Sequence, residues 1–144
     1  VEAAGQRGMS VDEVVTLASL VEKEAAVPEA RARISAVFHN RLTRGMLLQS
    51  DPTVLYGVPD HVGRIRKSDL QRRTPYNTYV ISGLPPGPIA NPGRASLEAA
   101  VYPTQGERAL YFVARNDRTH EFNEGLQGHE RAVDRYQRRP RRSP

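Results

Sequence analysis

The sequence of 144 residues contains no cysteine, no signal-peptide pattern and no apolar run long enough to cross a bilayer. The absence of cysteine excludes disulfides, thiolate metal sites and cysteine nucleophiles. Because the chain begins at Val1 and not at methionine, we expect it to be a fragment of a longer protein. Its length suits one domain with its own hydrophobic core.

Several motifs that carry chemistry are also missing. The sequence has no GxxxxGK[ST] phosphate loop, no GxGxxG dinucleotide fingerprint and no GxSxG nucleophile elbow. These absences argue against nucleotide-binding and serine-hydrolase functions. The histidines lack the spacing of a helical zinc pair, and no calcium-loop pattern occurs. They are His39, His61, His120 and His129. We therefore expect neither a metal ion nor another cofactor.

The positive charge is concentrated at one end of the chain. The formal net charge is +5 and the pI is near 10.0. Residues 135–144 contain five arginines and no acidic residue, so the rest of the chain has no net charge. A nucleic-acid surface needs basic residues clustered on the folded domain, so nucleic-acid binding is only a rival hypothesis drawn from the pI. We predict one domain over residues 1–138 and a basic, disordered tail over residues 139–144.

The best-specified element is a helix over residues 10–26. Ser10 and Glu13 form a capping box at its start. On a helical wheel its polar residues fall on one narrow stripe, and almost all the remaining surface is apolar. The stripe consists of Asp12, Thr16, Ser19 and Lys23. We therefore predict that this helix is mostly buried.

Two glutamates interrupt the apolar surface of this helix. Glu24 projects between Leu17 and Leu20, whereas Glu22 projects roughly 200° away around the axis. Burial raises the pKa of a carboxyl group, which makes Glu24 a candidate general acid. The alternative is a glutamate that reaches solvent at the helix end or pairs with an arginine. For Glu22 we predict a structural role with a hydrogen-bond or ion-pair partner, since a buried charge requires one.

The rest of the chain predicts a helical hairpin followed by a small β layer. A second helix over residues 29–44 follows Pro28 and ends at Gly45. The further predicted elements are short helices at Pro52 and at residues 68–70, a helix at residues 94–101 capped by Asn91, strands at residues 109–114 and 119–122, and a last helix from Asn123 to about residue 138. The pattern indicates an α+β fold, in which a helical part carrying Glu24 packs with the β layer.

One group of candidate binding residues precedes Pro52. Gln49, Ser50 and Asp51 present donors and acceptors suited to sugar hydroxyls, with Tyr56 behind them as an apolar platform. The alternative role for Ser50 or Asp51 is to cap the short helix that begins at Pro52.

Two further groups of polar residues are candidates. Tyr76, Asn77, Thr78 and Tyr79 precede a stiff proline- and glycine-rich loop and form either a wall of a binding groove or a simple connection. Asn40 and Arg41 lie near the end of the second predicted helix. They either hold a polar ligand or carboxylate, or are an ordinary exposed pair.

One buried glutamate, a set of polar and aromatic groove residues and the lack of a cofactor motif are typical of a glycosidase. An ordinary glycoside hydrolase uses two carboxylates that face each other across the scissile bond. Glu22 and Glu24 cannot do this from opposite sides of one helix. A reaction that uses a single acid is therefore predicted.

At these residues the sequence resembles the MltG/YceG family of bacterial endolytic murein transglycosylases. The matching stretches occur in the family's order within residues 10–138, and they are residues 17–24 (LASLVEKE), 37–42 (VFHNRL), 48–54 (LQSDPTV), 76–79 (YNTY) and 83–89 (GLPPGPI). Ser50 stands where the family often has threonine. Residues 59–67 and the arginine tail match nothing distinctive, and we assign them no role.

The resemblance implies that residues 1–138 are one catalytic domain with lysozyme-like active-site logic. Glu24 would be the single general acid and base in cleavage of the MurNAc–GlcNAc β-1,4 bond within peptidoglycan strands, which leaves 1,6-anhydroMurNAc ends. The residues expected to bind the glycan are Gln49, Ser50, Asp51, Tyr56, Tyr76, Asn77, Thr78 and Tyr79. Those expected to give structural support are Glu22, Asn40 and Arg41.

The resemblance also implies where the full-length protein works. It places the domain on the extracytoplasmic side of the bacterial cell membrane, with a single N-terminal membrane anchor and a small LysM-like domain that would precede this chain. Peptidoglycan synthases are the partners it implies. Two alternatives remain open: a hydrolytic muramidase that uses Glu24 with Asp51, and a catalytically inactive glycan-binding or scaffold module.

Overall fold

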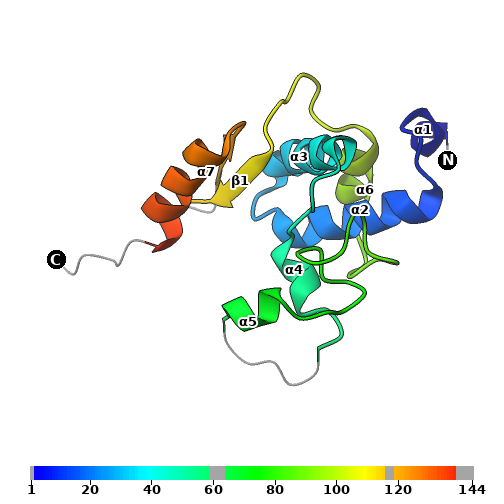
Figure 1. Ribbon diagram of the computed structural model, residues 1–144. Helices are drawn as coiled ribbons and strands as arrows, with labels where there is room; N and C mark the ends of the chain where they lie inside the picture. Colours follow the sequence, from blue (N-terminus) through cyan, green and yellow to red (C-terminus); the bar gives the residue numbers. More distant parts are fainter. Residues whose placement is uncertain (1, 59–63, 116–118, 139–144) are drawn as a thin grey trace.

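The computed structural model describes residues 2–58, 64–115 and 119–138 (Figure 1). The described elements are α1 (Glu2–Gln6), α2 (Val11–Glu24), a 3-10 turn (Pro28–Ala30), α3 (Arg31–Arg44), α4 (Asp51–Val54), α5 (Lys67–Leu70), α6 (Arg94–Val101), β1 (Tyr111–Ala114), β2 (His120–Asn123), α7 (Leu126–Val133) and a π-helical turn (Asp134–Arg138). The helices and the two-stranded sheet confirm the predicted α+β fold. The predicted tail at residues 139–144, most of the predicted turn between the strands (residues 116–118) and His61 lie outside the described residues.

Helix α2 is the centre of the helical part and packs against α3, α4 and α6. Its start has the predicted capping box: the Ser10 amide donates to Glu13 Oε1 (2.9 Å), and the Glu13 amide donates to Ser10 Oγ (3.1 Å). Leu17, Leu20 and Val21 are fully buried. Each such side chain contributes about 1.5–3 kcal/mol through removal of apolar surface from water, so α2 anchors the core.

The polar stripe of α2 is itself partly buried. Thr16 and Ser19 have almost no exposed surface. The Ser19 hydroxyl donates to the Thr16 carbonyl (2.6 Å) and accepts from the Ile89 amide (3.0 Å). The proline- and glycine-rich loop thus docks on α2 through this stripe, because the hydroxyl replaces the water that would otherwise satisfy the loop amide.

Several helix boundaries differ from the predictions. Helix α2 ends at Glu24 and not at residue 26, since Ala25 already has an extended backbone. The cap of α6 is Gly93 and not Asn91. The cap of α7 is Gly125 and not Asn123, because Asn123 is still paired with Tyr111 in the sheet. Helix α1, which has no capping motif in its five residues, was missed.

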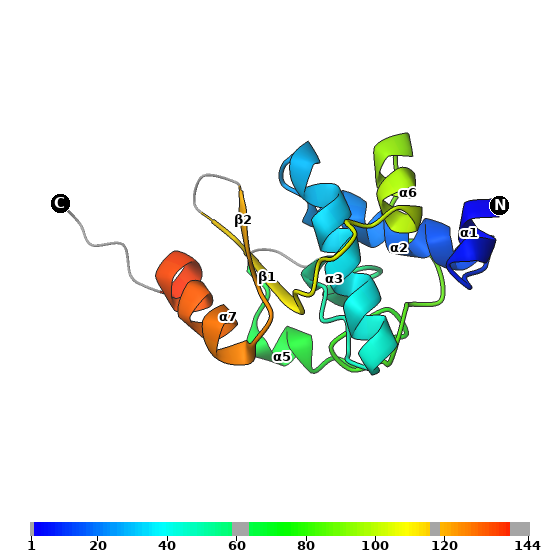
Figure 2. The ribbon, with the colours of Figure 1, turned by 90° about the horizontal axis from the view of Figure 1, so that it is seen from above.

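The β layer is an antiparallel hairpin in which Phe112 pairs with Phe122. Helix α7 packs against both strands and α3 contacts β1, so the hairpin lies between α7 and the helical part (Figure 2). Phe112 meets Phe38 of α3 edge to face, with ring centroids 5.9 Å apart. This aromatic contact fixes the hairpin against the helices.

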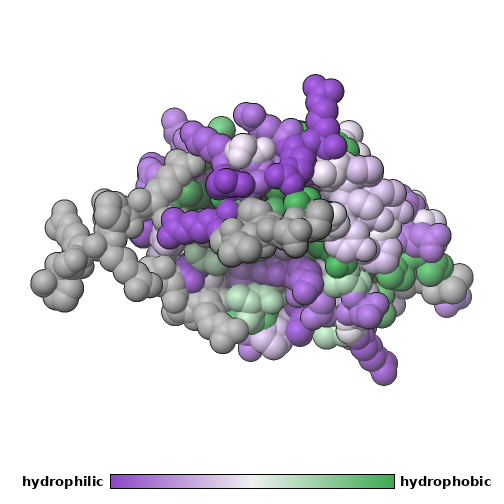
Figure 3. Space-filling view, turned by 90° about the horizontal axis from the view of Figure 1, so that it is seen from below, coloured by the Kyte–Doolittle hydropathy of each residue, from purple (hydrophilic) through white to green (hydrophobic). Residues whose placement is uncertain are grey.

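None of the described helices is both long and apolar enough to cross a membrane. Figure 3 shows one face of the molecule, on which hydrophilic residues predominate and hydrophobic residues gather only in small patches.

Candidate active site

A cavity of about 380 Å³ lies between the helical part and the β layer. We call it the central cavity. Its helical side is lined by Glu24, Arg41, Leu48, Gln49, Asp51 and Tyr79, and its other side by residues 110–114, His120, His129 and Val133. The cavity therefore joins the predicted acid to residues that are far away in the sequence.

Glu24 is the last residue of α2 and has an unusual protonation equilibrium. Its Oε1 accepts a hydrogen bond of 2.9 Å from the Ser50 hydroxyl, and it forms no ion pair with any residue that the structure describes. Burial raises the pKa of Glu24 to about 7, aided by the charge of Asp51 and opposed by the Ser50 hydrogen bond. The carboxyl group can therefore both donate and accept a proton near neutral pH.

Ser50 is held in place by a buried network of hydroxyl groups. The Ser50 amide donates to Thr78 Oγ1 (2.8 Å), and Thr53 Oγ1 donates to the Ser50 carbonyl (2.6 Å). Ser50 occupies the N-cap position of α4, as the capping alternative expected, but its side chain makes no capping hydrogen bond. Its hydroxyl is instead committed to Glu24.

Asp51 and Tyr79 form a second polar pair at the cavity. The Tyr79 hydroxyl donates to Asp51 Oδ1 at 2.5 Å. Burial, together with this contact, raises the pKa of Tyr79, so the phenol stays protonated. Both side chains line the central cavity, where their donors and acceptors are placed for a polar ligand.

Gln49 also lines the cavity, and it has a left-handed backbone conformation with φ 51°. Such a conformation costs about 1 kcal/mol or more outside glycine and is often found at ligand sites. Its amide donates to the Thr78 carbonyl (3.2 Å), which holds the strained residue in place.

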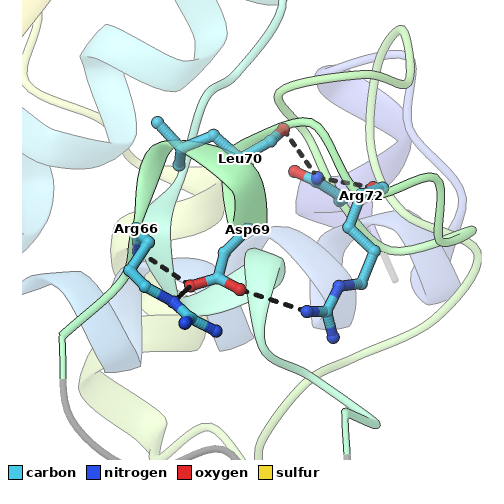
Figure 4. Close-up of polar contacts among 5 residues, drawn as sticks. Arg66, Asp69, Leu70 and Arg72 are labelled. Atoms are coloured by element: carbon cyan, nitrogen blue, oxygen red, sulfur yellow. Dashed lines mark hydrogen bonds and ion pairs between the residues drawn. The ribbon is translucent and has the colours of Figure 1, made fainter.

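Like Ser50, the other four residues predicted to bind the glycan do not line the central cavity. Tyr56 packs against Tyr76, with ring centroids 4.6 Å apart. Asn77 and Thr78 are fully buried. The Asn77 amide donates to the carbonyls of Leu70 and Arg72, at 3.0 and 2.8 Å (Figure 4). These side chains therefore build the loop that presents Tyr79. Their positions give no direct contact with a ligand in the central cavity.

Glu22 lies two positions before Glu24 but points to the N-terminus of α6. Its Oε1 accepts from the Gly93 amide (2.9 Å) and from the Ser96 hydroxyl (3.0 Å). These two hydrogen bonds hold the pKa of Glu22 below its usual value. The predicted hydrogen-bond partners are present, and a carboxylate at a helix N-terminus is favourable. That this contact steadies Glu24 stays a prediction.

Asn40 and Arg41 connect α3 to the chain that enters the β layer. Asn40 Nδ2 donates to the carbonyls of Glu107 and Ala109. Arg41 Nε donates to the Leu110 carbonyl (2.7 Å), and a terminal nitrogen donates to the Leu47 carbonyl (2.6 Å). These contacts fit the predicted structural support, because they fix both sides of the central cavity.

The sequence reasoning missed the wall formed by β1, β2 and α7. His120 is almost fully buried, and its burial keeps the pKa below the usual value, with the backbone of Glu24 acting in the opposite direction. Tyr111 stacks on His129, with centroids 4.9 Å apart. No local sequence pattern places these histidines at a cavity. Within the described ranges, no group of three or more ligand residues is placed to hold a metal ion.

A model of the YceG-like family matches residues 1–135 of the chain. The chain is 44% identical over 128 residues to the endolytic murein transglycosylase of Bacillus subtilis (strain 168). The aligned region covers 89% of this chain and 35% of that protein. It is 40% identical over 113 residues to the endolytic murein transglycosylase of Streptococcus pneumoniae (strain D39). Here the aligned region covers 75% of this chain and 20% of that protein. The chain thus spans about a third or less of the length of these relatives. A crystal structure of a YceG-like protein from Listeria monocytogenes is similar, with a TM-score of 0.81, 43% identity and coverage of 90% of this chain and 41% of that one.

Proposed function

Because the chain belongs to the YceG-like family, we propose that it contains the active site of an endolytic murein transglycosylase. In this proposal the substrate is a peptidoglycan glycan strand, and the MurNAc–GlcNAc β-1,4 bond is cleaved within it. The observation that carries the proposal is a partly buried glutamate with a pKa of about 7 on a cavity lined with polar and aromatic groups.

The reaction needs one group that first gives a proton and then takes one. Protonated Glu24 donates its proton to the glycosidic oxygen, and the bond between that oxygen and C1 breaks. The carboxylate of Glu24 then takes the proton of the 6-hydroxyl of the same N-acetylmuramic acid, whose oxygen forms a bond to C1. The products are a 1,6-anhydroMurNAc end and a new GlcNAc hydroxyl, and Glu24 is protonated again.

The substrate supplies its own nucleophile in this reaction, so no second catalytic carboxylate is required. The 6-hydroxyl is already attached to the sugar under attack, and its high effective concentration replaces an enzyme nucleophile. The Ser50 hydrogen bond fixes one oxygen of Glu24. Gln49, Asp51 and Tyr79 are then the residues we assign to holding the sugar in position.

We infer that the full-length protein acts on the extracytoplasmic side of the bacterial cell membrane, where murein is found. A single N-terminal membrane anchor and an association with peptidoglycan synthases are parts of this proposal. Residues 1–138 would serve as one catalytic domain. The proposed reaction uses no cofactor.

Mass spectrometry of digested glycan strands tests the reaction type. The proposal predicts products that end in 1,6-anhydroMurNAc. Reducing ends without anhydro products would contradict it and would favour a hydrolytic muramidase. An inactive glycan-binding or scaffold module would give no cleavage at all.

Hydrolysis is the second candidate because Asp51 lies on the same cavity and its charge acts on Glu24. In that reaction Asp51 would activate water or attack C1. The Asp51→Asn variant distinguishes the transglycosylase reaction from hydrolysis. A transglycosylase should retain the anhydro product at a reduced rate, whereas a muramidase that depends on Asp51 should lose its product.

A further inference from the structure

A second cavity, of about 900 Å³, shares Tyr79 with the central cavity. We call it the side groove, and it is lined by residues 70–71, 73–75 and 79–81. Because Tyr79 belongs to the walls of both cavities, the side groove lies next to the central cavity. The proposed reaction makes no use of this space.

Asn77 holds the two walls of the side groove together. Its side-chain amide donates to the carbonyls of Leu70 and Arg72 on one wall. On the other wall its Oδ1 accepts from the Tyr79 amide (2.9 Å), and its backbone carbonyl accepts from Val80 and Ile81 (3.0 Å each). The groove is thus fixed before any ligand arrives, which lowers the entropy cost of binding.

The arginines around the groove differ in whether they are paired with an acidic residue. Asp69 is 1% exposed and pairs with Arg72 at 3.1 Å and with Arg66 at 3.6 Å (Figure 4). Arg73 has no ion pair or hydrogen bond to any described residue, and it lines the groove. Its positive charge is therefore free to meet an anionic ligand.

The remaining lining is more suited to small aliphatic groups than to sugar rings. Val80 is 40% exposed, and Leu70 and Ile81 also line the groove. Tyr79 is the groove's one aromatic lining residue within the described ranges. A ligand that complements this surface has a carboxylate for Arg73 and small apolar groups for the aliphatic side chains.

We propose that the side groove binds the carboxylate-bearing peptide substituent of a muramyl residue whose sugar lies at Glu24. This inference rests on the proposed function and deepens it, since it gives the enzyme a preference for strands that carry peptides. In a murein strand the peptide is the part that combines carboxylates with small aliphatic side chains, whereas the sugar backbone is neutral where its lactyl groups are amide-linked to peptides.

Cleavage of matched substrates tests the preference in the full-length protein. We expect Arg73→Ala to lower kcat/KM roughly fivefold on peptide-bearing strands, the effect of one partly exposed ion pair. On strands stripped of peptides, with the freed lactyl carboxylates converted to amides, kcat/KM should be unchanged. Arg44→Ala is the control, because Arg44 is exposed at the end of α3 and lines neither cavity. An equal loss on both substrates, or no loss on either, would overturn the inference.

A binding measurement separates this inference from the reaction itself. Calorimetric titration with N-acetylmuramyl dipeptide needs no cleavage, since this probe has no glycosidic bond to a second sugar. We expect binding that weakens roughly fivefold in Arg73→Ala and not in Arg44→Ala. Equal affinity in all three proteins, or no binding to the unaltered one, would refute the groove assignment. Failure to cleave either strand, with this binding intact, would instead contradict the proposed function.

Discussion

Replacement of Glu24 by glutamine should stabilise the fold at neutral and alkaline pH. The pKa of Glu24 is about 7 in the folded protein, against an ordinary value of 4.5, mainly because burial disfavours the charged carboxylate. A group whose pKa is raised by folding contributes stability that is fully present below its unfolded pKa and lost as the pH rises through its folded pKa. The interval from 4.5 to about 7 corresponds to a loss of about 3 kcal/mol. The glutamine variant is neutral throughout and avoids this loss.

Urea denaturation at about pH 4 and about pH 8 measures the effect. At the lower pH the two proteins should unfold together. At the higher pH the variant should be about 3 kcal/mol more stable, which shifts the urea midpoint upward by roughly 2 M for a protein of this size. Equal midpoints at the higher pH would refute the claim that the folded protein buries this charge.

Glu22→Gln is the matched control on the same helix, and its effect has the opposite sign. The pKa of Glu22 is lowered by hydrogen bonds from Gly93 and Ser96, so its contribution to stability is present above pH 4.5 and lost as the pH falls through the folded pKa. This variant should be about 1 kcal/mol less stable than the unaltered protein near neutral pH, and the difference should shrink in acid.

The remaining predictions concern the pH profile and the tail. Ser50→Ala removes the hydrogen bond that favours charged Glu24, so the alkaline limb of kcat/KM should move to higher pH by about one pH unit. Thr53→Val, which disturbs the same network at the Ser50 carbonyl, should lower stability without moving the alkaline limb. An unchanged alkaline limb in Ser50→Ala would contradict the claim that Ser50 controls the protonation of Glu24. Deletion of residues 139–144 should leave the urea midpoint and glycan cleavage unchanged and should weaken any salt-sensitive DNA binding. Tight DNA binding by the shortened protein would revive the nucleic-acid hypothesis.

The position of Glu24 was predictable because its signals are local. The capping box at Ser10 and the spacing of apolar residues fix both the start and the buried face of α2. A glutamate on that face loses hydration, which favours a raised pKa. The pattern does not fix the direction by itself, because Glu22 also interrupts the apolar surface and its pKa is lowered by hydrogen bonds from Gly93 and Ser96. The two short strands were also predicted, since an apolar β-branched and aromatic run is a local feature.

The partners of Glu24 were not predictable in the same way, because they arise from contacts between distant segments. A polar side chain such as Asn77 or Thr78 gives the same sequence signal whether it meets a ligand or satisfies a buried backbone group. Burial decides between these roles, and here both residues are fully buried. His120 and His129 reach the cavity only through strand pairing and the packing of α7 on the hairpin, which no local pattern encodes.

Glycan cleavage by the pair Glu24→Gln and Glu22→Gln tests the central claim most directly. Anhydro products from purified peptidoglycan strands are quantified by mass spectrometry for the unaltered protein and for both variants. The account predicts that Glu24→Gln, although folded and more stable near neutral pH, forms no detectable anhydro ends, whereas Glu22→Gln keeps a measurable fraction of the activity at lower stability. An active Glu24→Gln variant beside a stable but inactive Glu22→Gln variant would show that the acid is the other carboxylate.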